Sequence, residues 1–326
     1  MCLTISLIII LYIFYRLYQH FFPKPNINPY GKYVLISGCD SGFGNGLAIE
    51  LDKQGFNVFA GVLISDNVAL LKNKLSSRAA VFCLDITKQE DIDSAFELVN
   101  EKTNVLHALV NNAGIGKSGY IDWTTLEFMH NIMNVNFFGH VAMTKKFLPL
   151  LIAKRDSRVI NISSVMGLIS PPGLSAYCAS KYAMESFSDC LRREMSPWGL
   201  RVSIIEPGWL RTPIIEGQDR AIRDLWNGLS LNIRNRWGDE FFNALVEKAI
   251  TKSPFINNAE NPIKVVRALR HAVMNTEPRI RYRPDWQAKL FFYPISMLPA
   301  WLFDFMSFKI INPSILPVGV KNQIQA

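Results

Sequence analysis

Short apolar runs alternate with longer amphipathic stretches between residues 33 and 206 of this chain. The short runs are rich in Val, Ile and Leu without polar alternation, which is typical of parallel strands buried on both faces. These runs begin near Tyr33, Asn57, Ala80, Leu106, Arg158 and Val202. The stretches between them have helical spacing, and no linker rich in Pro, Gly or Ser divides the chain. The pattern therefore predicts a single α/β domain built on a doubly wound parallel sheet.

The first apolar run leads directly into a turn with three glycines, spaced Gly-x-x-x-Gly-x-Gly, and a helical stretch follows from Leu47. A strand, a glycine-rich turn and a helix N-terminus together let backbone amides and the helix dipole hold a pyrophosphate. The spacing differs from Gly-x-Gly-x-x-Gly, so the inference depends on this context and not on the glycines alone. The residues predicted to bind a dinucleotide here are Gly38, Asp40, Ser41, Gly42, Phe43 and Gly44.

Tyr177 and Lys181 have the i, i+4 spacing that places two side chains on one face of a helix. A free phenol has a pKa of ~10, and a neighbouring ammonium lowers it, which makes Tyr able to take a proton from an alcohol. Ser164 stands thirteen residues upstream at the end of a predicted strand, where active residues of open parallel sheets gather. Ser164 is favoured over Ser163 because alternate strand residues face opposite ways.

Three further motifs lie between residues 111 and 208. An apolar run ends in Asn111-Asn112-Ala113-Gly114, Asn134 and Asn136 lie in a helical stretch, and Pro207-Gly208 follows the next strand. In this order the motifs resemble the short-chain dehydrogenase/reductase family, with a Rossmann fold, over residues 33–282. Within it they resemble the microsomal retinol dehydrogenase and 17-beta/3-alpha-hydroxysteroid dehydrogenase branch. The runs that carry this resemblance are 38–44, 163–167, 187–194 and 278–282.

The resemblance implies a role for each motif. Tyr177 would take the hydroxyl proton, Ser164 would bind the substrate oxygen, and Lys181 would also hold the nicotinamide ribose. Asn136, with Asn134 as its rival, would hold a water of a proton relay by disturbing its helix. The other cofactor contacts that the resemblance implies are Asp85, Asn111, Ala113, Gly114, Tyr177, Pro207, Gly208 and Thr212.

Purely structural roles are the alternatives for three of these residues. Asp85 could be the N-cap of the helical segment 87–102, and Asn111 with Gly114 could form a plain turn.

The cofactor is expected to be NAD. The position after the second strand that often carries an acid for the ribose holds Val62, and no Arg or Lys follows it closely. Asp40 would in addition repel a 2′-phosphate.

Residues 1–25 are predicted to be a membrane anchor. Met1–Tyr15 has no charged side chain and is strongly apolar, and Arg16 and two prolines follow it. A cleaved signal peptide and a buried helix are the alternatives. The predicted location is the endoplasmic reticulum membrane, with the cytosolic face favoured for a catalytic domain over residues 30–285.

The remaining residues, 286–326, are predicted to be an apolar C-terminal extension. The stretch 290–308 is rich in aromatic side chains and is broken by Pro294 and Pro299. It could cap the core, form a dimer contact, or lie in the bilayer interface near the mouth of a lipid pocket. A homodimer is left open.

The formal net charge is +8, from 35 Lys and Arg against 27 Asp and Glu, but the basic residues are scattered. No basic block or recognition motif appears, so nucleic acid is not an expected partner. The five cysteines have no metal-ligand spacing, and all are expected to be reduced, with Cys83 and Cys190 buried. His107, His140 and His271 are expected to be structural.

The motifs, with the family that they resemble, imply an oxidoreductase that transfers a hydride between a lipophilic alcohol, retinol or a hydroxysteroid, and NAD. Specificity is expected to depend on the stretch after Trp209. The residues predicted to carry it are Ile214, Ile215, Leu225, Trp226 and Phe241. The alternative is a non-catalytic scaffold or lipid-binding protein on a dehydrogenase fold, against which the intact set of Asn136, Ser164, Tyr177 and Lys181 speaks.

Overall fold

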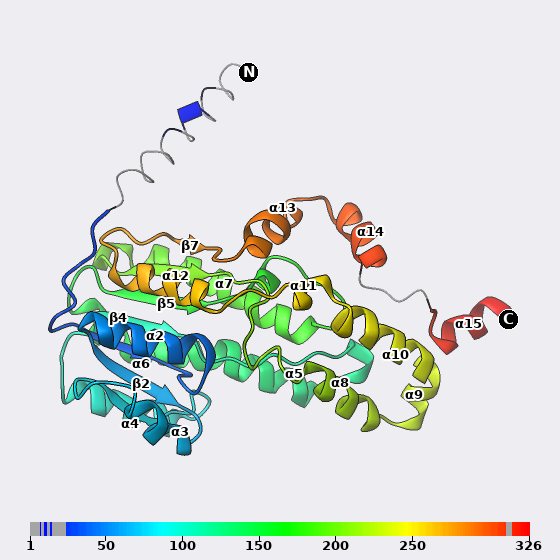
Figure 1. Ribbon diagram of the computed structural model, residues 1–326, viewed down its shortest axis with the longest axis horizontal. Coiled ribbons are helices and arrows are strands. Elements are labelled where there is room, and N and C mark those ends of the chain that lie inside the picture. Colours follow the sequence, from blue (N-terminus) through cyan, green and yellow to red (C-terminus); the bar gives the residue numbers. More distant parts are fainter. Residues whose placement is uncertain (1–6, 8–9, 12–13, 15–23, 311–314) are drawn as a thin grey trace.

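The computed structural model describes residues 7, 10–11, 14, 24–310 and 315–326. Its centre is one parallel sheet of seven strands in the order β3-β2-β1-β4-β5-β6-β7 (Figure 1). The strands are β1 (Tyr33–Ile36), β2 (Asn57–Val62), β3 (Ala80–Cys83), β4 (Ala108–Asn111), β5 (Arg158–Ile162), β6 (Arg201–Ile205) and β7 (Arg281–Tyr282). The predicted doubly wound parallel sheet is confirmed, with the change of winding direction between β1 and β4.

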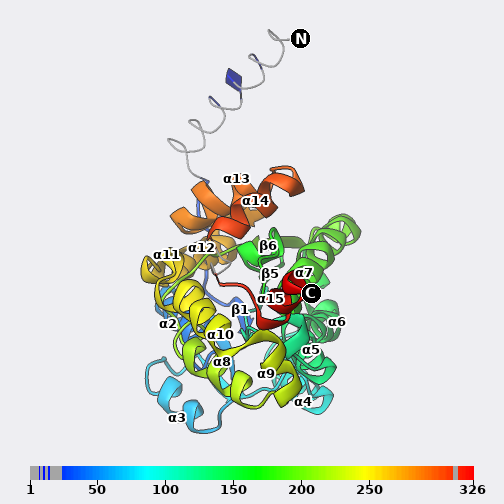
Figure 2. The same ribbon diagram turned by 90° about the vertical axis from the view of Figure 1, so that its right-hand side faces the viewer.

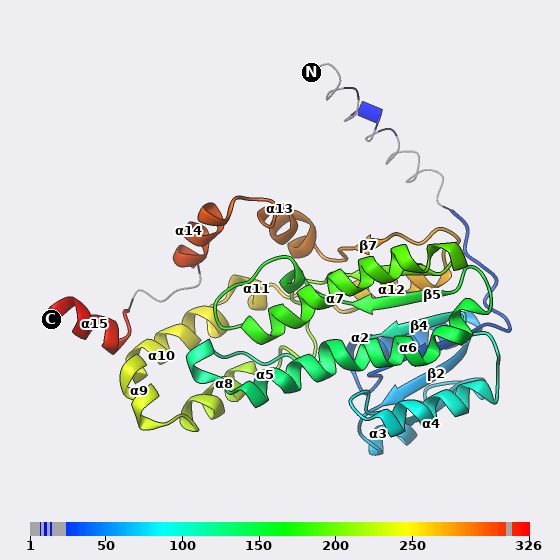
Figure 3. The ribbon, with the colours of Figure 1, turned by 180° about the vertical axis from the view of Figure 1, so that it is seen from behind.

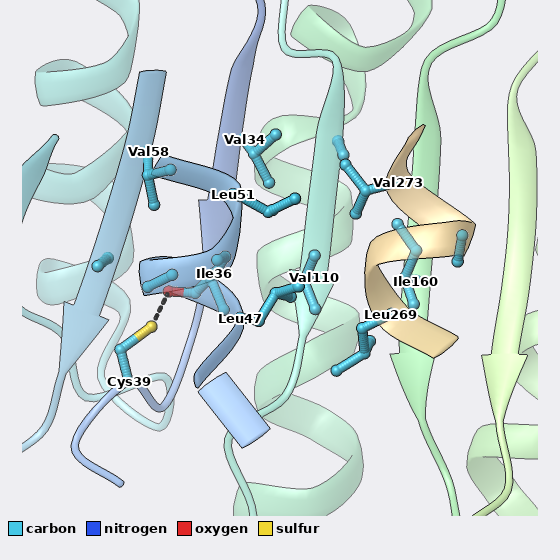
Figure 4. Close-up of a cluster of buried hydrophobic side chains, with 14 of the residues drawn as sticks. Val34, Ile36, Cys39, Leu47, Leu51, Val58, Val110, Ile160, Leu269 and Val273 are labelled. Carbon is cyan, nitrogen blue, oxygen red and sulfur yellow. Dashed lines mark hydrogen bonds between the residues drawn. The ribbon is translucent and has the colours of Figure 1, made fainter. Parts of the chain in front are cut away.

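Helices cover both faces of this sheet. One face carries α2 (Gly42–Gln54), α3 (Asp66–Lys72) and α12 (Ile263–Met274). The other carries α4 (Gln89–Asn100), α6 (Gly139–Ile152) and α7 (Ser175–Glu194), seen from behind in Figure 3. On the first face, Leu47 and Leu51 of α2 pack with Leu269 and Val273 of α12 against the sheet (Figure 4). Both faces of the sheet are buried, which explains why its strands have no polar alternation.

Arg158 at the start of β5 is only 1% exposed. Its guanidinium Nη1 donates to the carbonyl oxygens of Ala272 (3.1 Å), Val273 (2.7 Å) and Asn275 (2.9 Å). These carbonyls close the C-terminus of α12, where a positive charge is favourable. The buried charge therefore fixes the end of α12 against the sheet, and burial lowers the pKa of Arg158 to about 10.

Four short helices extend beyond the carboxyl edge of the sheet. They are α8 (Gln218–Asn227), α9 (Leu231–Trp237), α10 (Asp239–Val246) and α11 (Pro254–Asn257). An aromatic cluster holds the first three together, with the rings of Trp226 and Phe242 stacked at 4.4 Å between centroids. Trp123, which follows β4 along the chain, packs edge-on against Trp226 at 5.2 Å. These helices thus form a firmly packed wall beyond the sheet.

The C-terminal extension begins after β7 and continues past the carboxyl edge of the sheet, with α13 followed by α14 along its path (Figure 1 and Figure 2). Its helical segments are η6 (Gln287–Phe292), α13 (Tyr293–Ile295), α14 (Ala300–Ile310) and α15 (Val318–Gln325). Arg283 joins it to the sheet, because its Nε lies 2.6 Å from buried Glu206 Oε2 while its guanidinium stacks 3.4 Å from the Tyr293 ring centroid.

The anchor predicted over residues 1–25 falls almost entirely outside the described residues, and no helix in the described part is long and apolar enough to cross a membrane.

Cys39 and Cys178 are buried, but Cys83 and Cys190 are exposed, so the prediction of burial was wrong for this pair. Cys83 ends the edge strand β3, and Cys190 lies on the outer side of α7.

Candidate active site

A cavity of about 530 Å³ lies along the carboxyl ends of the strands, beside the change of winding direction. This is where open α/β sheets bind their ligands. Most of the predicted site residues line it. They are Gly38, Asp40, Ser41, Gly42, Phe43, Asp85, Ala113, Gly114, Ser164, Tyr177, Lys181, Pro207, Gly208 and Thr212. The structure thus brings together residues from five strand ends that are distant in the sequence.

The glycine turn forms the floor of one end of this cleft. Gly38 has a φ of 69°, which favours glycine, and a Cβ there would lie 2.6 Å from Ala113 Cα. Gly44 does not line the cleft; it lies inside the turn, where a Cβ would collide with the backbone of Gly38 and with the Asn112 amide. The turn is therefore a close-packed cradle of backbone that a larger residue would fill, which fits a pyrophosphate at the N-terminus of α2.

Asn112, which sequence reasoning missed, holds this cradle in place. Its Nδ2 donates to the carbonyl oxygens of Ser37 and Gly38, both at 2.9 Å. Asn111 instead points into the interior and donates to Thr144 Oγ1 (3.0 Å) and Asn161 Oδ1 (2.8 Å). The side chain of Asn111 therefore does not line the cleft, whereas Asn112 does. Alternation along the strand predicts that adjacent side chains face opposite ways, but it does not say which of the two faces the cleft.

The acid of the glycine turn reaches the end of β2. Asp40 accepts hydrogen bonds from Leu63 N (2.9 Å), Ile64 N (3.0 Å) and Asn67 Nδ2 (2.9 Å). The side chain of Val62 is fully buried, so the strand itself presents no polar group there. A carboxylate from another segment thus stands where this fold places an acid for the adenosine ribose.

Asp85 lies on the opposite wall of the same end of the cleft. It accepts hydrogen bonds from Thr87 N (3.0 Å) and Thr87 Oγ1 (2.7 Å). Helix α4 begins only at Gln89, with Lys88 as its N-cap, so Asp85 is not the helix cap that the alternative interpretation required.

Ser164, Tyr177 and Lys181 meet at the centre of the cleft. Ser164 follows β5; its Oγ donates to the Pro207 carbonyl oxygen (3.4 Å) and accepts from Met166 N (3.2 Å), and its hydroxyl acts on the Tyr177 phenol. Lys181, one turn after Tyr177 on α7, has its Nζ 5.6 Å from the Tyr177 ring centroid. Ser163 faces the other way, toward the Lys181 carbonyl oxygen (3.5 Å).

The pKa values of this pair differ from the expectation. Burial raises the pKa of Tyr177 to about 12, although the hydrogen bond from Ser164 acts in the opposite direction. Burial also lowers the pKa of Lys181 to about 8, against the charge of Glu185. The Lys181 ammonium donates to the Ile162 carbonyl oxygen at 3.0 Å and does not reach the phenol. The lowered phenol pKa expected from the spacing is therefore not found, because burial outweighs an ammonium held elsewhere.

Asn136 lies behind this centre in the π-helix η2 (Asn134–Phe138). Its Oδ1 accepts from Ile115 N and its Nδ2 donates to Ile115 O, both at 2.9 Å, while Nδ2 also lies 3.2 Å from Ser180 Oγ. The side chain is fully buried, whereas the rival Asn134 is exposed. The helix is disturbed at the expected place, and Asn136 joins the cleft wall at Ile115 to the residue beside Lys181.

The three histidines lie in interior contacts. His140 Nε2 is 2.7 Å from Ala113 O, His107 Nε2 is 3.1 Å from Val273 O, and His271 Nδ1 is 2.8 Å from Tyr282 Oη. Burial lowers the pKa of both His107 and His140 to about 3. No cluster of three or more metal-ligating side chains occurs in the described residues.

The other end of the cleft is apolar. Ile214 and Ile215 line it as predicted, but Leu225, Trp226 and Phe241 do not, because they pack in or against the aromatic cluster of α8–α10. The helices contribute instead the side chains of Ile222, Leu245, Val246, Ala249 and Ile250. The C-terminal extension adds Phe291, Phe292, Ile295, Phe303 and Met306. The extension thus forms part of the cavity wall. One of the three roles predicted for it placed it near the mouth of such a pocket.

Comparisons with known proteins agree with this geometry. A family model described as short chain dehydrogenase matches residues 32–222. The chain is 39% identical over 280 residues to 17-beta-hydroxysteroid dehydrogenase type 6 of Bos taurus and 41% identical over 280 residues to retinol dehydrogenase 7 of Mus musculus. Each alignment covers 84% of this chain and 87% of the relative.

The fold is also shared with solved structures. A short-chain dehydrogenase from Streptomyces avermitilis, 25% identical, superposes with a TM-score of 0.68 over 87% of this chain and 97% of its own. The predicted resemblance to retinol and hydroxysteroid dehydrogenases is confirmed by the relatives. With its glycine turn, its Ser164–Tyr177–Lys181 centre and a family match over most of the sheet, the chain belongs to the short-chain dehydrogenase family.

Proposed function

We propose that this oxidoreductase transfers a hydride between a lipophilic alcohol, a retinol or a hydroxysteroid, and NAD. One observation supports this more than any other. A single cavity joins a glycine cradle at one end, the side chains of Ser164 and Tyr177 at its centre and an apolar chamber at the other end. A dinucleotide and a water-insoluble alcohol can therefore meet at the phenol.

The chain's own residues divide the chemistry of alcohol oxidation. Ser164 donates to the substrate oxygen and keeps it near Tyr177, whose phenolate form accepts the hydroxyl proton. The positive charge of Lys181 favours that form, and Asn136 connects this centre to the interior through Ser180. Gly38, Asp40 and the turn at Pro207–Gly208 would hold the nicotinamide dinucleotide, which supplies the hydride acceptor.

The chamber determines the class of alcohol. Most of its walls are Ile, Leu, Val, Ala, Met and Phe side chains from α8, α10, η5 (Glu247–Thr251) and the C-terminal extension, with Gln218, Lys248 and Ser307 as the polar members. Burial of apolar surface is worth roughly 25 cal/mol per Å², so such walls favour a rigid hydrocarbon over a small polar alcohol. The relatives that carry retinol and hydroxysteroid names are consistent with this choice. The scaffold alternative is not favoured, because it gives no reason for a complete catalytic set.

A substrate panel tests the proposal. Full-length protein in membranes is incubated with retinols, 3-hydroxysteroids, 17-hydroxysteroids and ethanol, and NADH formation is followed by absorbance. We expect turnover of at least one lipophilic class and none of ethanol at equal concentration. Turnover of none of them, with the protein folded and NAD bound, would favour the scaffold.

The cofactor preference can be tested at Leu63, which is exposed at the cleft beside Asp40. Wild-type kcat/KM should be higher with NAD than with NADP, because Asp40 repels a 2′-phosphate and no Arg or Lys closely follows Val62 in the sequence. Leu63→Arg should narrow that gap by offering the phosphate a partner, and Leu70→Arg, which is equally exposed but does not line the cleft, should not. A wild type that uses NADP equally well would contradict the proposal.

We also propose that the chain divides into an anchor over residues 1–25, a catalytic domain over 30–285 and an apolar extension over 286–326, at the endoplasmic reticulum membrane. Several large side chains of the extension are exposed. They include Leu290 (74%), Met297 (64%), Trp301 (69%) and Phe305 (55%). Such a surface is suited to the bilayer interface, beside the chamber that the same helices line.

Full-length protein is therefore expected to stay in microsomal membranes through alkaline carbonate washing. Deletion of residues 1–25 should release much of it and leave a fraction held by the extension, while NAD binding is retained. Protein that is soluble after simple lysis would refute the anchor, and a mature N-terminus near residue 20 would identify a cleaved signal.

A further inference from the structure

Asp285 lies at the junction between β7 and the C-terminal extension and is only 1% exposed. Its two carboxylate oxygens accept different backbone hydrogen bonds. Oδ2 accepts from Gly208 N at 2.8 Å, and Oδ1 accepts from Ala288 N at 2.9 Å. One side chain therefore ties the turn after β6 to the first turn of η6. Hydrogen bonds to a charged acceptor are stronger than those between neutral groups.

Gly208 is shaped for this contact. A Cβ at Gly208 would lie 2.6 Å from Asp285 Oδ1 and 3.1 Å from Gln287 Cβ. The carboxylate thus packs directly on the backbone of the Pro207–Gly208 turn, and only glycine at this position leaves room for it.

Gln287 makes a second link from the same segment, and it is fully buried. Its Oε1 accepts from Trp209 N at 3.4 Å, and its Nε2 donates to the carbonyl oxygens of Phe255 (3.0 Å) and Asn258 (3.2 Å). The ring of Trp209 stacks on Phe255 with centroids 5.6 Å apart. The turn after β6 and the wall at α11 are therefore held by one amide.

The opposite side of the turn is fixed to the catalytic strand. Val165 N donates to the Pro207 carbonyl oxygen at 3.0 Å, and Ser164 Oγ approaches the same oxygen at 3.4 Å. The turn is thus clamped between the residues that follow β5 and the start of the C-terminal extension.

We propose that Asp285 and Gln287 are positioning residues for the nicotinamide end of the cofactor. This rests on the proposed function, in which Pro207, Gly208 and Thr212 face that end. Neither Asp285 nor Gln287 lines the cleft; they act through the turn, whose position against Ser164 and Tyr177 they fix. Their side-chain hydrogen bonds go to Gly208, Trp209, Phe255, Asn258 and Ala288, whereas Asn112 holds the cradle at Gly38, so the two ends of the cofactor would be supported by different residues.

Asp285→Asn tests this role. The amide retains one oxygen, so at most one of the two N–H groups keeps its acceptor while the other faces an NH₂ group. The measurement is the Kd of full-length protein for NAD and for ADP-ribose, which has the same adenosine and pyrophosphate but no nicotinamide. We expect NAD to bind about 10-fold more weakly and ADP-ribose to bind within about twofold of wild type.

Asp52→Asn is the matched control. Asp52 is 5% exposed and its carboxylate accepts hydrogen bonds from Ser76 N (2.8 Å), Ser76 Oγ (2.5 Å) and Arg78 Nη2 (3.4 Å), but it lies at the end of α2 away from the cleft. It should lower thermal stability and leave the ratio of the two affinities unchanged. Gln287→Met, which keeps the shape and removes all three hydrogen bonds, should reproduce the selective loss of NAD affinity if Asp285→Asn does not fold.

The outcomes separate the inference from the proposed function. A wild type that binds neither ligand would contradict the proposed function. A wild type that binds NAD, with variants that lose both ligands equally or neither, would overturn the positioning role and leave the proposed function standing.

Discussion

Replacement of Tyr177 by Phe is expected to abolish turnover, with kcat lowered at least about 1,000-fold. The change removes only the hydroxyl, which is the group that exchanges a proton with the substrate. The ring stays in place between α7 and the cleft, and Lys181 keeps its hydrogen bond to the Ile162 carbonyl oxygen at 3.0 Å. The affinity for NAD, measured by titration, should therefore change by less than about threefold.

Tyr182→Phe provides the control for this substitution. Tyr182 lies on the same helix α7 but is 43% exposed and does not line the cleft. Its loss should leave kcat within about twofold of wild type. Near wild-type turnover by Tyr177→Phe would remove Tyr177 from the catalytic role.

Lys181→Met is expected to have the second largest effect, lowering kcat/KM about 100-fold at neutral pH. The side chain is 4% exposed, so Met fills its volume while removing the charge 5.6 Å from the Tyr177 ring centroid. Without the ammonium the phenolate is harder to form. The pH profile of alcohol oxidation should therefore move to higher pH in the variant.

The sign of this pH dependence follows from the two pKa directions. Oxidation needs the deprotonated phenol, and burial raises the pKa of Tyr177 to about 12, so the rate should rise with pH through the alkaline range. The pKa of Lys181 is lowered to about 8, so wild type loses the same positive charge above that pH. The gap between wild type and Lys181→Met should be widest below pH 8 and narrow above it.

Lys145→Met, an exposed position on α6, is the control and should leave the profile unchanged. A profile for Lys181→Met with the same shape and midpoint as wild type would show that Lys181 does not act through the phenol.

The parts of the site set by local geometry could be predicted from the sequence. The helical period puts Tyr177 and Lys181 on one face of α7, and the end of a buried strand puts Ser164 beside them. The sheet itself followed from apolar runs of strand length, because a sheet buried on both faces leaves its strands no polar positions.

Other parts depend on contacts between distant segments. Asn111 and Asn112 are adjacent, and which of them faces the cleft depends on how β4 sits between β1 and β5. Leu225, Trp226 and Phe241 have the composition of a substrate wall, yet they pack in or against the aromatic cluster that also contains Trp123. The side chains that replace them come in part from the C-terminal extension, whose path over the cleft has no local signature.

The prediction of a lowered pKa for Tyr177 was wrong for a related reason. Spacing fixes that Lys181 lies one turn away, but the acceptor of its ammonium is the Ile162 carbonyl oxygen on a different element. The link from Asp285 to Gly208 likewise joins residues 77 positions apart and needs the folded chain to be seen.

In the proposed reaction Tyr177 deprotonates a lipophilic alcohol, and the carbinol hydrogen of that alcohol passes as hydride to NAD. The most direct test is single-turnover transfer with a hydroxysteroid or retinol carrying deuterium at the carbinol carbon. Wild-type protein is predicted to yield NADH that contains the deuterium, and Tyr177→Phe to bind the same NAD and yield none. Oxidised product without deuterium in the NADH, or equal transfer by the two proteins, would contradict the account.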